Sequence, residues 1–218
     1  MTRPPRTTVT STQPRRTGVI LSTGAVGLLL IGVLLVTASG TSREFFAWAW
    51  DRHANILSWY IRPLFLIPLT YFSYKRRFSG IVITLLALAT SMFWFPRPAQ
   101  VTPAVAEFLR FERAWLTSGW EVQKLLMSLL PVIGLSALCA AFWKRSLTWG
   151  LVVINILAVT KLAWGVLFGQ GTGWAMLAPA VTGLLICDAA VLYAIGRIRR
   201  RSTGTRTIPT SPITFPRR

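Results

Sequence analysis

Two long apolar runs separated by a basic triplet constrain the fold of this chain more than any other feature. The runs cover residues 56–74 and 81–95, and Lys75, Arg76 and Arg77 lie between them. A helix of roughly 20 residues crosses the ~30 Å hydrocarbon core of a bilayer. Lysine and arginine collect in the connections that face the cytoplasm. This stretch therefore predicts a membrane hairpin with a cytoplasmic turn.

The same pattern recurs along the chain, which is 53% hydrophobic and only 14% charged. A surface helix of a soluble protein would carry a polar face, and a membrane barrel strand would alternate polar and apolar residues. The apolar runs here are continuous. We therefore expect an all-α, polytopic transmembrane bundle of about six spans. The predicted spans are residues 19–38, 55–74, 79–95, 122–143, 148–168 and 174–195.

The spans define a membrane domain over residues 18–196, flanked by two basic tails rich in Thr, Pro and Arg. Residues 1–17 and 197–218 lack apolar periodicity, which predicts disordered cytoplasmic tails. The first apolar run has a second interpretation as a cleaved signal peptide, because residues 36–38 are small enough for a cleavage site. Its length of about 20 residues favours an uncleaved span.

Charge sets the orientation. The connections assigned to the inside contain basic residues and no acid, whereas five of the six acidic residues lie in the outside connections. This asymmetry predicts cytoplasmic termini in a plasma membrane, of the bacterial inner-membrane type. The net charge of +18 is then explained by topology and by anionic lipid headgroups at the cytoplasmic face, without nucleic acid. Other membrane proteins or a second copy of the chain are further expected partners.

The connection between the third and fourth spans predicts a short interfacial helix over residues 104–116. Its apolar arc includes Val105, Phe108 and Leu109, but Glu112 falls in the middle of that arc. A carboxylate in acyl chains is costly. The helix either lies on the membrane surface or packs over the outer ends of the spans, where Glu112 meets a basic partner. The position of Glu112 favours the second arrangement.

Charged residues within the spans are the best functional candidates, because each costs at least ~2.5–3.5 kcal/mol to insert. Arg62, Lys124 and Lys161 fall in the outer half of their spans, and Asp188 falls toward the inner half of the sixth. These four residues predict an outward-facing polar pocket that binds or translocates a small ligand, such as an anion. A subunit of a membrane complex fits the same pattern. The alternative is that the cations pair with external carboxylates or reach the interface.

The single histidine, His53, excludes sites that need several histidines, and we predict neither a metal nor a cofactor. A second functional hypothesis is a membrane-embedded enzyme that acts on a lipid or lipid-linked substrate at the outer interface. Its acid–base groups would be Asp51, His53 and Glu112. The leading hypothesis, in which the chain binds or translocates a small ligand, involves no enzymatic activity.

An internal repeat is a further hypothesis. An offset of 70 residues aligns Phe72 with Phe142 and Gly80 with Gly150, and both segments are predicted hairpins of the same orientation. That alignment would make a parallel repeat. Chance matching between apolar sequences is the alternative.

Overall fold

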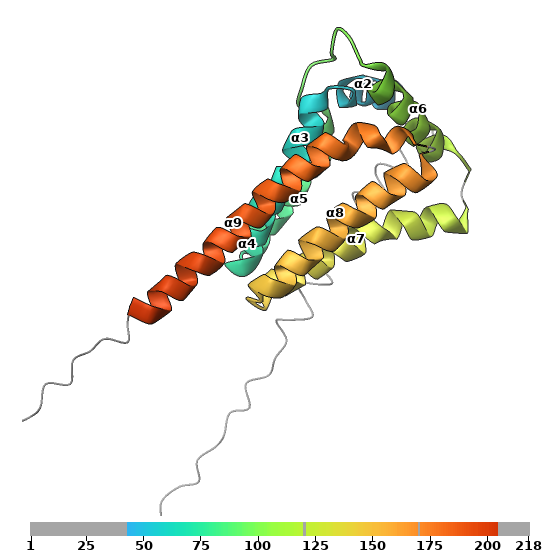
Figure 1. Ribbon diagram of the computed structural model, residues 1–218. Coiled ribbons are helices and arrows are strands. Elements are labelled where there is room, and N and C mark those ends of the chain that lie inside the picture. The colour runs from blue at the N-terminus through green and yellow to red at the C-terminus, as the bar shows by residue number, and fades with distance from the viewer. Residues whose placement is uncertain (1–42, 120, 170, 205–218) are drawn as a thin grey trace, which may run out of the picture.

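The computed structural model describes residues 43–119, 121–169 and 171–204, and every regular element in these ranges is a helix (Figure 1). The predicted all-α class is therefore confirmed for this part of the chain. The predicted first span, 19–38, and the amino-terminal tail lie outside the described residues. The helices are α2 (Arg43–His53), α3 (Ile56–Leu64), α4 (Leu66–Tyr74), α5 (Phe78–Thr90), α6 (Pro103–Thr117), α7 (Val122–Trp143), α8 (Leu147–Phe168) and α9 (Leu177–Gly204), with 3-10 helices η2 (Ser91–Phe93) and η3 (Thr172–Met176).

Three stretches of the described chain are long and apolar enough to cross a membrane, namely Val122–Trp143, Leu147–Phe168 and Thr172–Ile198. They coincide with the last three predicted spans. Their apolar side chains are widely exposed, with Val122 and Leu167 each 75% accessible. Soluble monomers rarely expose large continuous apolar patches. These three helices are therefore compatible with a lipid environment.

The predicted span 55–74 is not one helix but two, α3 and α4, which meet at Phe65. Pro68 has no N–H to donate to the carbonyl of Leu64, and its ring crowds that carbonyl. The chain closes α3 instead with a bond from the Phe65 N–H to the Arg62 carbonyl at 3.1 Å. The predicted span 79–95 is also shorter as a helix, because α5 ends at Thr90 and continues only as η2. Crossing by these two segments stays a prediction.

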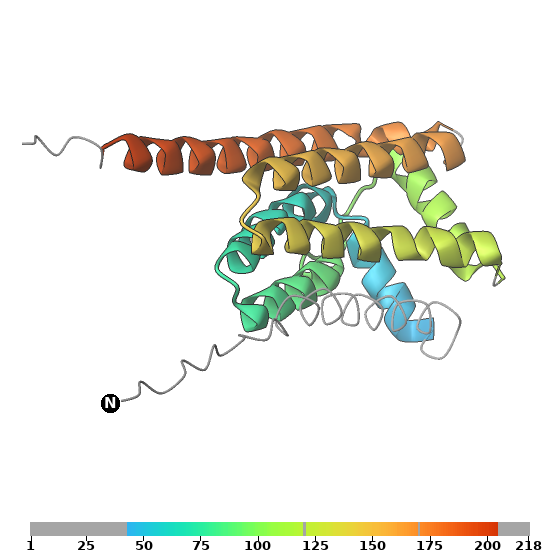
Figure 2. The same cartoon turned by 90° about the horizontal axis from the view of Figure 1, so that it is seen from below.

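The helices form one bundle with a cap at one end. Helices α7, α8 and α9 run side by side, and α3 and α4 pack against α9 and α7 (Figure 2). Helices α2 and α6 lie together at the end where α3 begins (Figure 1). Aromatic and aliphatic side chains fill the space beneath this cap: Phe46, Trp50, Trp59, Val105, Phe108 and Leu109.

A glycine fixes the distance between α3 and α9. Gly183 lies against the ring of Pro63, and a Cβ at this position would overlap that ring. One turn further along α9, the Cys187 Sγ donates to the Pro63 carbonyl at 3.3 Å. The backbone of α3 is therefore held against α9 at the residue that follows Arg62.

The turns α4–α5 and α7–α8 have the same geometry. Arg76 and Arg145 adopt left-handed backbone angles, with φ of 55° and 59°. The residue after each arginine donates to a carbonyl five positions back, which is a Schellman closure. The contacts are reciprocal, because Arg76 Nε donates to the Trp143 carbonyl at 3.2 Å and the Arg145 guanidinium lies 5.6 Å from the Tyr74 ring. The two turns are alike in structure, whereas α4 and α5 are much shorter than α7 and α8, and a common origin of the two hairpins stays a prediction.

Two boundaries differ from the sequence-based expectation. Helix α9 continues to Gly204, although the disordered tail was expected from residue 197. Arginine is a good helix former and is favoured near a helix carboxyl terminus, which explains the extension. Residues 205–218 lie outside the described ranges. The expected helix over 104–116 is present as α6, and it begins with Pro103 in the first turn.

Candidate functional site

Four polar side chains from four helices meet beneath the α2–α6 cap. The Arg62 Nη2 lies 2.9 Å from the His53 Nδ1, and the His53 Nε2 lies 3.4 Å from the Glu112 Oε2. The Lys161 Nζ lies 3.2 Å from the Glu112 Oε1. The contacts thus form one chain that joins α3, α2, α6 and α8.

The direction of donation along this chain follows from its chemistry. A guanidinium can only donate, so the Nδ1 of His53 must accept from Arg62 and carries no proton. The proton of a neutral imidazole then lies on Nε2, which donates to the Glu112 carboxylate. His53 therefore bridges Arg62 and Glu112 as the neutral Nε2–H tautomer.

The surroundings of His53 favour the same neutral form. The residue is 6% exposed, and its ring lies 5.2 Å from the Trp50 ring and 5.9 Å from the Trp59 ring. The Trp59 indole N–H donates to the His53 carbonyl at 2.9 Å, which fixes the backbone there. Burial, followed by the charge of Arg62, lowers the pKa of His53 to about 4 in spite of Glu112. His53 is thus uncharged at neutral pH.

Glu112 points inward because of its place on α6. Val105, Phe108 and Leu109 are the buried residues of this helix, and Glu112 follows them at helical spacing. Burial alone would raise the pKa of the Glu112 carboxyl, but Lys161 and the His53 hydrogen bond outweigh burial and hold the pKa well below its usual range. The predicted basic partner for Glu112 is confirmed as Lys161.

Lys161 is the accessible member of the cluster. Its side chain is 48% exposed, whereas that of Glu112 is 15% exposed. The ammonium lies 4.7 Å from the centre of the Trp164 ring, which favours a cation at this position. With His53 neutral, Arg62 and Lys161 face one carboxylate, so the cluster carries a surplus positive charge.

Two of the four predicted pocket residues lie elsewhere. The Lys124 Nζ donates to the carbonyls of Leu116 and Ser118 at 2.6 and 2.8 Å, where it caps the end of α6. Asp188 accepts from the Asn155 Nδ2, at 3.2 Å to each carboxylate oxygen, and this pair joins α8 to α9. The predicted convergence of these residues with Arg62 and Lys161 on one pocket is thus not seen.

The three predicted acid–base residues, Asp51, His53 and Glu112, do not all lie together. Asp51 pairs with Arg97 at 3.2 Å on the surface, where the two side chains are 47% and 73% exposed. His53 contacts Glu112 instead. The link between His53 and Arg62 was missed by sequence reasoning, because a cap at Asn55 separates their two helices.

No group of three or more histidine, cysteine or acidic side chains within the described ranges is placed to hold a metal ion. The comparisons with known proteins add no assignment. No family model matches the chain, and neither does any curated protein or solved structure.

Proposed function

We propose that the chain crosses a plasma membrane six times, with both termini in the cytoplasm, and binds a small anion at its outer face. In this topology α3 and α4 form one broken span, about 28 Å long at 1.5 Å per residue. The α2–α6 cap then lies outside and the two arginine turns lie inside, in agreement with the distribution of basic residues. Reporter fusions at the α4–α5 turn and at the carboxyl terminus test this orientation, and external reporters there would contradict it.

One observation carries the anion proposal: two basic side chains from different helices belong to one chain of contacts that contains a single carboxylate. Arg62 is linked to Glu112 through His53, and Lys161 contacts it directly. Cations fixed in a low-dielectric wall attract an anion more strongly than cations in water. The half-exposed Lys161 is the first contact for an incoming anion. Because the Glu112 side chain already places a carboxylate beside Lys161, the carboxylate of a small ligand such as acetate suits the same position.

The test measures acetate binding by purified protein in nanodiscs, by calorimetry. We expect the unmodified chain to bind acetate and Lys161→Met to lose binding, because the accessible cation is gone. Lys144→Met is the matched control, since Lys144 is an exposed residue of the α7–α8 turn. Equal binding by the unmodified chain and Lys161→Met, or no binding by either, would contradict the proposal.

Removal of the internal carboxylate provides a second arm. Glu112→Ala leaves Lys161 and His53 without their acidic partner, so this variant should melt at a lower temperature. Added acetate should restore the melting temperature by occupying the vacated position. Rescue by sodium chloride at equal ionic strength would show simple screening and would argue against a carboxylate site.

The His53–Glu112 contact supports a second candidate function, an enzyme that acts on a lipid or lipid-linked substrate at the outer interface. A carboxylate that orients a histidine is a frequent acid–base arrangement. In this structure the unprotonated Nδ1 of His53 accepts a hydrogen bond from Arg62, so a substrate would have to take the place of that guanidinium. His53→Gln distinguishes the two functions, because glutamine keeps both hydrogen bonds but cannot act as a base. It should retain acetate binding and abolish acid–base catalysis.

A further inference from the structure

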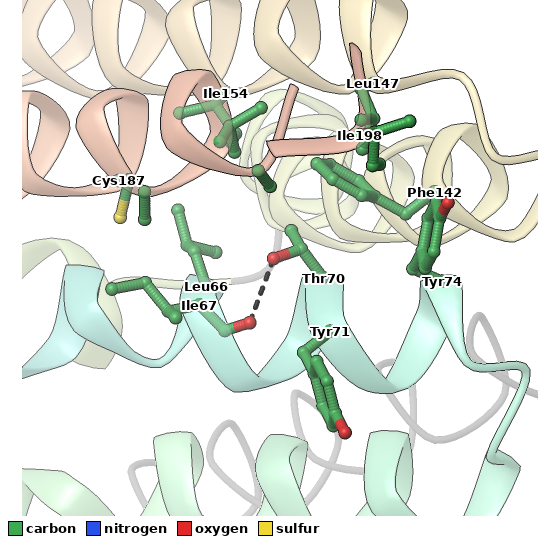
Figure 3. A pocket seen from close by; sticks show the side chains of 13 residues that line it. Leu66, Ile67, Thr70, Tyr71, Tyr74, Phe142, Leu147, Ile154, Cys187 and Ile198 are labelled. Atoms are coloured by element: carbon green, nitrogen blue, oxygen red, sulfur yellow. Dashed lines mark hydrogen bonds between the residues drawn. The ribbon is translucent and has the colours of Figure 1, made fainter. Parts of the chain in front are cut away.

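An apolar groove lies between α4, α7, α8 and α9 (Figure 3). Its volume is about 190 Å³. The hydroxyl of Thr70 donates to the Ile67 carbonyl at 2.9 Å, so its proton is not available to a ligand in the groove. Aliphatic and aromatic side chains of α4, α7, α8 and α9 supply most of the lining, among them Leu66, Tyr74, Phe142, Cys187, Ala194 and Ile198.

The shape of the groove suits a hydrocarbon chain. From Cys187 to Ile198 the α9 wall is about 16 Å long at 1.5 Å per residue. This length is about half of the ~30 Å hydrocarbon core, which is the depth of one leaflet. A closed apolar cavity of ~150 Å³ is large enough to take up benzene. A groove of about 190 Å³ therefore has room for part of a hydrocarbon chain.

Cations stand where the groove ends. Tyr74 lines the groove, and the exposed Arg145 guanidinium lies 5.6 Å from its ring. On α9, Arg197 follows Ala190 by seven residues, so the two lie on nearly the same helix face. Arg197 is exposed, and Ala190 lines the groove. The turns 75–77 and 144–146 and the segment 197–204 contain no acidic residue, so this end attracts a negative headgroup.

We propose that the groove binds one acyl chain of an anionic phospholipid from the cytoplasmic leaflet, with its phosphate held by Arg145 and Arg197. The apolar wall selects the chain, and the arginines select the charge of the headgroup. A phosphate at these arginines would tie the α7–α8 turn to the end of α9. The inference rests on the six-span topology proposed above. It is independent of the anion site, which lies at the opposite end of the bundle.

The experiment titrates delipidated full-length protein with phosphatidylglycerol or phosphatidylcholine of identical chains, by native mass spectrometry. We expect one phosphatidylglycerol to bind more tightly than phosphatidylcholine. Arg145→Asn, which tolerates the left-handed backbone, should weaken phosphatidylglycerol binding about fivefold, as should Arg197→Gln. Neither change should affect phosphatidylcholine binding to a comparable degree.

Ala194→Phe places a ring in the groove and should abolish the bound lipid. Ala189→Phe is the matched control, because Ala189 is exposed on α9 and does not line the groove. Equal affinity for the two lipids would overturn the charge selection. Unchanged binding in Ala194→Phe, or no lipid bound to the unmodified chain, would overturn the groove as the site. The arginine variants keep the test informative if Ala194→Phe fails to fold.

Discussion

The buried His53 predicts that the protein loses stability on mild acidification. Its pKa falls from the ordinary value of 6.5 to about 4 in the folded chain. Between these values the unfolded chain binds a proton that the folded chain does not, so stability falls as the pH drops through this window. A proton on Nδ1 would also point at the Arg62 guanidinium and break the 2.9 Å hydrogen bond.

The size of the effect follows from the same values. A pKa difference of this size corresponds to a loss of about 2 kcal/mol between pH 7 and pH 5. For a chain of this length, that loss lowers the melting temperature by roughly 4–8 °C. Glu112 adds little over this interval, because the folded carboxyl stays ionised and the ordinary pKa of 4.5 for the unfolded chain lies below pH 5. The chain has no second histidine to contribute.

The assay compares thermal unfolding of the unmodified chain and His53→Gln, followed by intrinsic tryptophan fluorescence at several pH values. Glutamine can donate to Glu112 and accept from Arg62, as the neutral histidine does, but it does not titrate. The variant should therefore melt at nearly the same temperature at pH 7 and pH 5. A pH-dependent loss of the same size in both proteins would refute the assignment to His53.

Three further variants test the packing around the site. Gly183→Ala forces its new Cβ against the Pro63 ring, so it should destabilise the bundle by about 1–3 kcal/mol and weaken acetate binding. Lys124→Met removes the contacts that cap the end of α6, so it should lower the free energy of unfolding by about 1.5–3 kcal/mol. Acetate binding should stay intact. Asn155→Leu removes the amide partner of Asp188 and should destabilise the chain by about 1–3 kcal/mol. Thermal unfolding and calorimetry measure all three, and wild-type stability in any of them would contradict the corresponding contact.

The long apolar helices were predictable because hydrophobic composition over about 20 residues is a strong local signal. The boundaries 122–143 and 148–168 agree with the structure to within a residue. The break at Phe65 was less accessible, since neighbouring helices often repair the loss that a proline causes. The sequence could predict that Glu112 has a basic partner, because an unpaired carboxylate on the apolar face of a helix is costly to bury.

The particular contacts of the site were not predictable, because they depend on how four helices are placed in three dimensions. Lys124 and Lys161 look alike as buried cations in sequence. Only packing assigns one to the carbonyls of α6 and the other to Glu112. His53 has the same difficulty, since nothing in its neighbours shows that Arg62 folds back on it. The position of a charged residue along a predicted span therefore identifies it as a candidate but does not identify its partner.

The most direct test of the central claim is the nitrogen-15 spectrum of selectively labelled histidine in nanodiscs. The chain contains one histidine, so each ring nitrogen gives a single signal. At neutral pH we predict a neutral ring with the proton on Nε2, and a change in the Nδ1 shift as saturating acetate competes for Arg62. A protonated ring, the opposite tautomer, or an Nδ1 shift unmoved by acetate would contradict the proposed anion site.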